Sequence, residues 1–210
     1  MYFVYGEKEI RHLQARDPRL GQIIRQIGHI DREVDSDLFA SVVHQIIGQQ
    51  ISSKAQATVW KRLLAAFGSI TPRQLGGIST EALRALGIPQ RKAQCILTFT
   101  QKVLTGEMDL QKIAKQTDQE AIACLTQLPG IGVWTAEMLL IFCLQRPDIL
   151  SFRDLGIQRG MRMVYALKSI DKSSFATIRA RLSPFGSVAS FYFWAVNGGA
   201  CQLVDPAKAP

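Results

Sequence analysis

Apolar residues recur at steps of three and four along most of the chain. The segment 38–68, LFASVVHQIIGQQISSKAQATVWKRLLAAFG, shows this spacing over its whole length. Residues three and four apart share one face of an α-helix, so the pattern predicts amphipathic helices. The same spacing returns in segments 81–87, 91–104, 120–128, 134–144, 157–167 and 185–197. We expect about ten helices in all.

Glycine and proline separate these segments, at 67–72, 86–90, 128–132, 146–148 and 182–186. Side chains that favour helix N-termini precede several segments, namely Ser52, Ser53, Thr71, Ser79 and Asp118. Strand-like alternation is nearly absent, and YFVY at 2–5 is the one short candidate. The sequence therefore predicts an all-α fold, and we favour a two-lobed helical bundle with a cleft between the lobes. The pattern does not locate a lobe boundary.

The composition is that of an ordinary globular protein. The 210 residues are 47% hydrophobic and 20% charged, and no uncharged apolar run reaches about 18 residues. We expect no transmembrane span, and no secretory signal because the first residues lack a basic start followed by an apolar run. The four cysteines form no C-x-x-C pair and there are three histidines, so we expect no zinc or iron–sulfur site.

The net charge is +8 and it is unevenly distributed. Residues 1–50 hold six Lys and Arg against seven Asp and Glu, whereas the rest of the chain holds nineteen against ten. A basic surface favours a polyanion, with nucleic acid as the first expectation and anionic lipid as the second. On charge alone, a basic surface that binds no partner is an equally good interpretation.

The turn LPGIG at 128–132 separates two helical segments. Backbone N–H groups at a helix start have no intrahelical partner, and they lie at the positive end of the helix dipole. Pro129 fixes the entry, Gly130 and Gly132 permit unusual torsions and close approach, and Ile131 can anchor the turn in the core. The turn can thus hold a phosphate. A glycine-rich turn with no ligand is the competing interpretation.

Four motifs together resemble one family. They are IIGQQISSKAQA at 46–57, LRALGIPQRKAQCI at 83–96, LPGIGVWTAEMLL at 128–140 and RPDILSFRDLGIQRG at 146–160. The chain resembles the helix-hairpin-helix base-excision DNA glycosylases over 38–197, and within them the 3-methyladenine, or alkylpurine, branch. The resemblance implies one glycosylase domain over 1–210, a helix-hairpin-helix at about 118–144 and an active cleft between two lobes. Residues 1–35 look too short for the extra N-terminal sheet domain of longer relatives.

Asp154 occupies the position of the family's catalytic aspartate. Breaking an N-glycosidic bond leaves positive charge on the sugar, which one carboxylate can stabilise while it orients water. An alkylated purine already carries positive charge, so it leaves without a dedicated acid. Asp154 can also cap the helix that follows it, and both roles are compatible. We interpret the neighbouring acids Glu137 and Asp148 as structural.

Some members of the family attack the sugar with a lysine, and Trp134 stands at that lysine's position. Tryptophan cannot form a Schiff base, and neither Lys54 nor Lys92 matches the position. The resemblance therefore implies a monofunctional hydrolase in which water attacks.

A base must leave the duplex before its N-glycosidic bond can be cleaved, and the pocket that receives it needs aromatic faces. The resemblance implies a pocket lined by Trp134, Trp194, Met138, Leu155 and Phe39. Met138 and Leu155 replace tyrosines of some relatives, which puts the substrate range in doubt. Core packing is the alternative for Trp194.

The resemblance also implies DNA contacts outside the pocket. Gln50, beside Ile51, matches the residue that fills the hole left in the duplex, and Arg91 and Lys92 are candidate phosphate contacts. The hairpin would contribute Gly130, Ile131, Gly132 and Val133. The carbonyls of Thr126, Leu128 and Gly130 are candidate ligands of a structural Na⁺ or K⁺, and no cofactor is expected to be required.

The resulting prediction is an enzyme that removes 3-methyladenine- or 7-methylguanine-type bases from double-stranded DNA. We expect a monomer with no membrane association, located in the cytoplasm with the bacterial nucleoid or in a nucleus. Two alternatives remain open. One is a glycosylase for another lesion, such as hypoxanthine or ethenoadenine. The other is a helix-hairpin-helix DNA-binding protein without catalysis.

Overall fold

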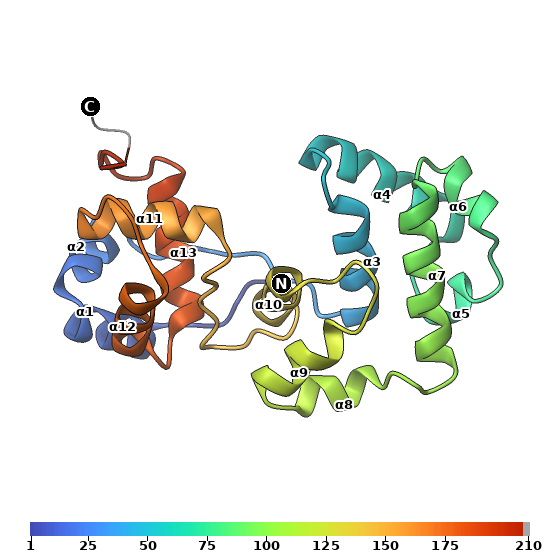
Figure 1. Cartoon of the computed structure of the whole chain (residues 1–210), viewed down its shortest axis with the longest axis horizontal. Coiled ribbons are helices and arrows are strands. Elements are labelled where there is room, and N and C mark those ends of the chain that lie inside the picture. Colours follow the sequence, from blue (N-terminus) through green and yellow to red (C-terminus); the bar gives the residue numbers. More distant parts are fainter. Residues whose placement is uncertain (208–210) are drawn as a thin grey trace. The chain divides into compact units, whose positions relative to one another are not determined.

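A computed structural model describes residues 1–207 of the chain (Figure 1). Within that range the chain forms helices and no strand, and Tyr2 and Glu33 make a single isolated antiparallel bridge. The prediction of an all-α fold is confirmed, while YFVY forms no strand. The helices are α1 (Glu7–Arg16), α2 (Pro18–Ile27), α3 (Leu38–Gly48), α4 (Ser53–Phe67), α5 (Pro72–Leu75), α6 (Thr80–Ala85), α7 (Gln90–Leu104), α8 (Leu110–Lys115), α9 (Asp118–Leu125), α10 (Val133–Phe142), α11 (Leu155–Tyr165), α12 (Lys172–Leu182) and α13 (Gly186–Asn197).

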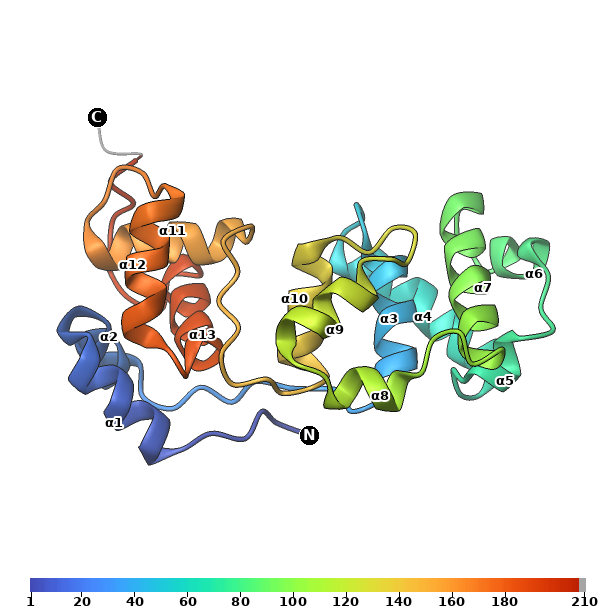
Figure 2. The ribbon, with the colours of Figure 1, turned by 60° about the horizontal axis from the view of Figure 1, so that its bottom comes forward.

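The chain divides into two compact units. Unit 1 combines Met1–Val34 with Leu140–Pro210, and unit 2 is the continuous segment Asp35–Leu139. Unit 1 therefore contains α1, α2, α11, α12 and α13, and unit 2 contains α3 to α9, as can be followed in Figure 2. The change of unit falls within α10, which is why no composition shift in the sequence marks it.

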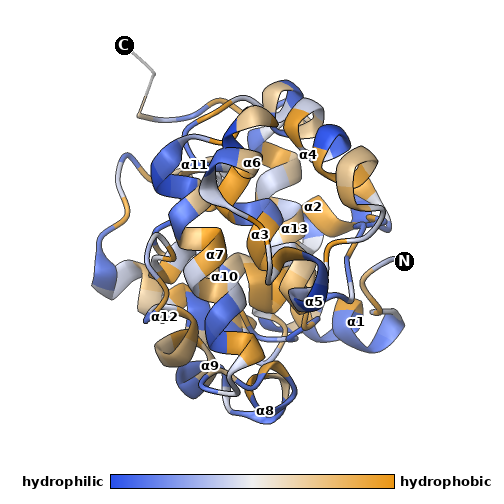
Figure 3. Cartoon of the chain, turned by 90° about the vertical axis from the view of Figure 1, so that its right-hand side faces the viewer, coloured by the Kyte–Doolittle hydropathy of each residue, from blue (hydrophilic) through white to orange (hydrophobic). Residues whose placement is uncertain are grey.

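Unit 1 is built around α13. Most residues of this helix are buried, including Phe191, Tyr192 and Phe193, which are 0% exposed. A helix that is apolar on all sides belongs in a core. α11 packs closely on it, because a Cβ on Gly160 would collide with the backbone carbonyl of Phe193. Figure 3 shows how the outer helices, such as α1, combine hydrophilic and hydrophobic faces.

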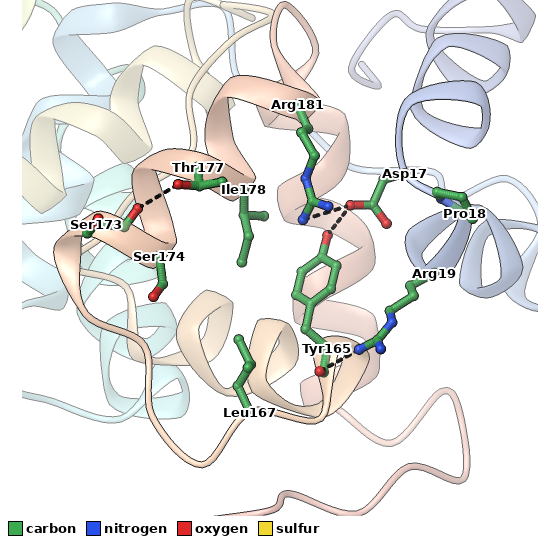
Figure 4. A pocket seen from close by; sticks show the side chains of 10 residues that line it. All are labelled: Asp17, Pro18, Arg19, Tyr165, Leu167, Ser173, Ser174, Thr177, Ile178 and Arg181. Atoms are coloured by element: carbon green, nitrogen blue, oxygen red, sulfur yellow. Dashed lines mark hydrogen bonds and ion pairs between the residues drawn. The ribbon is translucent and has the colours of Figure 1, made fainter.

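A buried polar cluster joins α2, α11 and α12 in unit 1. Asp17 is 1% exposed, caps α2 by accepting a hydrogen bond from the Leu20 amide at 3.0 Å, and accepts another from the Tyr165 hydroxyl at 3.0 Å. Arg181 lies 3.3 Å from the same carboxylate, and Arg19 donates to the Tyr165 carbonyl at 2.6 Å (Figure 4). Burial, then the Asp17 charge, raises the pKa of Tyr165. A shallow pocket of about 680 Å³ opens here.

Unit 2 is centred on α3 and α7. Phe39 of α3 stacks on Phe99 of α7 with 4.9 Å between ring centroids, and both rings are buried. The apolar pattern over 38–68 corresponds to two helices, because α3 ends at Gly48 and Ser52 caps α4 through the Ala55 amide at 3.2 Å. Ser53 is the first residue of α4 and not a cap.

Five helices lie outside the segments that the periodicity selects, namely α1, α2, α5, α8 and α12. The start of α9 also differs, because Thr117 is the cap and pairs with Glu120 in a capping box, whereas Asp118 is the first helical residue. Thr71 and Ser79 cap α5 and α6 as predicted. Within residues 1–207, no helix combines the length and apolar character needed to cross a bilayer.

Candidate nucleic-acid interface and active site

The predicted helix-hairpin-helix is present in unit 2. It consists of α9, a turn over 126–132 and the start of α10. Gly130 has φ +87°, a conformation that favours glycine, and Ile131 is 4% exposed and anchors the turn. Gly132 lacks the predicted unusual torsion, because its backbone is not left-handed. A Cβ there would meet open space, and close approach of a ligand at this position stays a prediction. Only Gly130 is therefore required for the torsions of the turn.

The N–H groups of the turn fall into two kinds. The Ile131 amide donates to the Leu128 carbonyl at 3.0 Å, so it is used within the turn. The amides of Gly130, Gly132 and Val133 donate to no acceptor in the part of the chain that the structure describes. Unused donors at the start of a ten-residue helix suit an anion, and phosphate binding at this turn stays a prediction.

The Gly130 carbonyl, a predicted cation ligand, accepts a hydrogen bond from the Gln49 side-chain amide at 2.6 Å. The Leu128 carbonyl, a second predicted ligand, accepts the Ile131 amide. A carbonyl oxygen has two lone pairs, so it can accept one N–H and still coordinate a cation. The monovalent ion at the hairpin stays a prediction, and no step below depends on it.

The loop between α3 and α4 lies beside this turn. Gln50 is exposed and has φ +58°, and Ile51 is 40% exposed. The Lys92 ammonium donates to the carbonyls of Ile47 at 2.8 Å and Gln49 at 2.6 Å. Arg91, its neighbour on α7, is exposed. A cavity of about 440 Å³ within unit 2 brings predicted residues together, lined by Ile46, Gln49, Gln50, Arg91, Lys92, Cys95, Gly130, Trp134 and Thr135.

Asp154 lies in unit 1, at the start of α11. Its Oδ1 accepts the Ile157 amide at 2.8 Å, so Asp154 is the N-cap, as predicted. The same oxygen accepts a hydrogen bond from the Trp194 indole at 3.0 Å. A Cβ on Gly156 would lie 3.0 Å from Trp194 Cδ1 and 3.1 Å from Asp154 Oδ1. The sequence Asp-Leu-Gly thus caps the helix and makes room for the indole.

Trp194 is half-buried among aromatic side chains. Phe142 stacks on it at 5.6 Å with the rings inclined at 25°. The Arg32 guanidinium lies 5.7 Å from its ring and 5.6 Å from that of Phe191. Arg32 Nε is buried and without a hydrogen-bond partner among the described residues, and burial lowers the pKa of this arginine. Trp194 therefore acts both as a core residue and as a partner of Asp154.

The remaining pocket candidates differ in exposure. Trp134 is 41% exposed and Leu155, next to Asp154, is 64% exposed, so both offer apolar surface to a ligand. Phe39 and Met138 are each 3% exposed and present little surface in this structure. Asp148 is structural, as predicted, because its carboxylate accepts the Ser183 hydroxyl at 2.6 Å and the Gly186 amide at 3.0 Å.

Three residues near these candidates were not selected by sequence reasoning. Gln49, Phe142 and Arg32 each lie against a candidate through the fold. Phe142 and Arg32 belong to no motif, whereas Gln49 adjoins Gln50 within the motif at 46–57 and could have been selected.

Comparison with known proteins identifies the family. The chain is 27% identical over 205 residues to DNA-3-methyladenine glycosylase 1 of Schizosaccharomyces pombe, covering 94% of this chain and 88% of that protein. The crystal structure of a DNA-3-methyladenine glycosidase from Bacillus halodurans superposes with a TM-score of 0.85 at 33% identity, over 95% of this chain and 93% of that one.

The Schizosaccharomyces pombe 3-methyladenine DNA glycosylase solved with abasic DNA superposes with a TM-score of 0.78 at 26% identity, over 93% of this chain and 100% of that one. The chain spans 59% and 57% of the length of two Bacillus subtilis relatives. Residues 43–184, two thirds of the chain, match a family described as "HhH-GPD superfamily base excision DNA repair protein". The chain belongs to the HhH-GPD superfamily.

Proposed function

We propose that the chain is a monofunctional DNA glycosylase that hydrolyses the N-glycosidic bond of alkylated purines in duplex DNA and leaves an abasic site. The observation that carries the proposal is Asp154, a carboxylate fixed by the α11 amide end and the Trp194 indole in a chain of this superfamily. The names of its relatives support the alkylpurine substrate, and the relative solved with abasic DNA supports the product.

Asp154 would stabilise the positive charge that develops on the deoxyribose. Opposite charges at about 4 Å attract by about 1 kcal/mol in water and about 4 kcal/mol at an effective dielectric near 20. Asp154 is 7% exposed, so little water screens it. Its hydrogen bonds fix the carboxylate before the reaction begins, which avoids reorganisation in the transition state.

The leaving group explains why a single carboxylate is enough. An alkylated purine is already positively charged, so its departure does not require protonation. Trp134 offers an exposed aromatic face, and a cation over a tryptophan ring gains about 0.5–2 kcal/mol. Because Trp134 also stands where the lyase lysine of related enzymes stands, the carboxylate directs water onto the sugar and the strand stays intact.

The DNA would be held by the hairpin and the loop beside it. The unused amides at Gly130, Gly132 and Val133 suit a phosphate, and Arg91 adds an exposed positive charge. Gln50 would fill the gap left by the everted base. We expect the enzyme to act as a monomer on damaged duplex DNA.

The test incubates the protein with methylated duplex DNA, identifies released bases by mass spectrometry, and detects abasic sites by alkali treatment. Wild type should release 3-methyladenine and 7-methylguanine without cleaving the strand, and Asp154→Asn should bind DNA but release neither. Equal release by the two proteins would remove Asp154 from the mechanism. Strand cleavage before alkali treatment would refute the monofunctional assignment.

A further inference from the structure

We propose that Lys92 is a positioning residue, which holds the loop over 49–52 in the shape that presents Gln50, and is not a contact to the DNA backbone. The inference rests on the proposed function for the identification of this loop as the element that enters the duplex. It replaces the sequence-based interpretation of Lys92 as a phosphate contact.

Lys92 caps the end of a neighbouring helix. Its ammonium donates to the carbonyls of Ile47 and Gln49, at 2.8 and 2.6 Å, where α3 ends. The last carbonyls of a helix lack intrahelical partners, and they lie at the negative end of its dipole. α3 has no basic residue in its own last turn, and the positive charge at its end comes from Lys92 of α7.

The residue that follows this cap is in an unfavourable conformation. Gln50 has φ +58°, which costs free energy for any residue with a side chain, and such a conformation persists where the surroundings fix it. Lys92 fixes the carbonyl of Gln49, and the Gln49 side chain donates to the Gly130 carbonyl at 2.6 Å. Ser52 fixes the other end of the loop by capping α4.

These anchors connect the loop to the hairpin before DNA arrives. Gln49 is held at its main chain by Lys92 and at its side chain by the phosphate-binding turn. The cavity of about 440 Å³ lies among these groups. A loop that is already ordered loses less entropy when it enters a duplex. The arrangement therefore aligns Gln50 with the hairpin as one preformed surface.

Lys92 and its neighbour Arg91 differ in how far they are buried. Lys92 is half-buried, and loss of solvent lowers its pKa, whereas Arg91 is exposed and has no partner within residues 1–207. The Lys92 ammonium uses two of its three N–H donors on the carbonyls of Ile47 and Gln49, so at most one donor remains for another partner. Arg91 has all of its donors available for a phosphate, which makes it the matched control.

The first experiment measures the salt dependence of binding to duplex DNA that carries an abasic-site analogue. Loss of one phosphate contact lowers the slope of log affinity against log salt by about one. We expect that decrease for Arg91→Met and an unchanged slope for Lys92→Met and Lys92→Gln. A decrease of about one in the Lys92 variants would overturn the proposal. This readout requires no catalysis.

The second experiment compares single-turnover base release from duplex and single-stranded DNA of the same sequence. A single strand has no gap to fill, so Lys92→Met should slow release from duplex at least tenfold and from the single strand less than twofold. Lys92→Arg, which keeps the donors, should restore most of the duplex rate. Equal slowing on both substrates would overturn the positioning role.

The outcomes separate this proposal from the proposed function. Absence of base release by wild type would refute the function, whereas the salt slopes would still report on Lys92. Circular dichroism checks the fold of each variant. Lys92→Gln, whose amide can still donate to a carbonyl, gives the same salt-slope comparison where Lys92→Met does not fold.

Discussion

At the scale of single residues, Asp154 depends on its neighbours. The indole of Trp194 donates to Oδ1, and that N–H can be removed while the aromatic ring is kept. A hydrogen bond to a charged group contributes about 1.5–3 kcal/mol. We therefore expect Trp194→Phe to lower the single-turnover rate about 10- to 100-fold, with affinity for abasic DNA changed less than about twofold. Trp60→Phe, far along the chain in unit 2, is the control.

Arg32 bears on which lesion is released, because the proposed base pocket includes Trp194. Its guanidinium lies 5.7 Å from that ring, so a cationic purine near Trp194 meets a like charge. Two unit charges about 6 Å apart repel by about 0.7 kcal/mol in water and about 3 kcal/mol at an effective dielectric of about 20. Arg32→Met should raise the release of 7-methylguanine relative to neutral hypoxanthine at least about threefold. A constant ratio, measured by mass spectrometry, would contradict this role.

At the scale of elements, Gly160 sets the distance between α11 and α13. An added methyl group would meet the Phe193 carbonyl, which is backbone and cannot rotate away. Overpacking costs about 1–3 kcal/mol or more, beyond the gain of about 1 kcal/mol that alanine brings to a helix. We expect Gly160→Ala to lower the free energy of unfolding in urea by at least about 2 kcal/mol. Gly77→Ala, where a Cβ meets open space, should leave it nearly unchanged.

His44 of α3 makes the free energy of unfolding depend on pH. Burial, only partly opposed by Asp35, lowers the pKa of His44, whose ring packs on Trp60 at 4.8 Å. Because the folded state binds the proton less well than the unfolded state, stability from this group is lost as pH falls below about 6.5. His44→Gln should therefore lose less unfolding free energy between about pH 7.5 and about pH 5.5 than wild type does. Equal losses of unfolding free energy in wild type and His44→Gln, measured by urea titration at the two pH values, would exclude the effect.

The helices show what periodicity can and cannot predict. Segments with a wide apolar face, such as 91–104 and 157–167, correspond closely to α7 and α11. In contrast, α1 buries only Leu13, and α8 is too short to display a period, so neither produces a clear pattern. Turn chemistry was also predictable, since Gly130 has the left-handed torsion that its position required.

Contacts between distant segments were not predictable from any local pattern. Lys92 and Arg91 are equivalent in the sequence, and only the fold shows that Lys92 caps α3. Asp154 was found because a motif marks it, whereas Arg32 reaches Trp194 through the packing of unit 1 and has no motif. Residues that act through tertiary contacts therefore require the structure, while residues that act through local geometry do not.

At the scale of the whole molecule, positive charge is concentrated in unit 1. That unit holds fifteen Lys and Arg against nine Asp and Glu, whereas unit 2, which carries the hairpin, holds ten against eight. Arg153 and Arg159 of unit 1 are exposed on either side of the Asp154 cap, and neither has a partner in the described part of the chain. Both units are therefore expected to contribute to the electrostatic affinity for DNA.

The double substitution of Arg153 and Arg159 to Met tests this distribution of charge. If each arginine neutralises one phosphate, the slope of log affinity against log salt should fall by about two on damaged and undamaged duplexes alike. Arg11→Met should leave the slope unchanged, since Arg11 is paired with Glu7 at 2.8 Å. An unchanged slope in the double variant would mean that neither arginine contacts a phosphate. Because these arginines flank Asp154, a reduced slope would instead mean that the carboxylate operates close to the phosphate backbone.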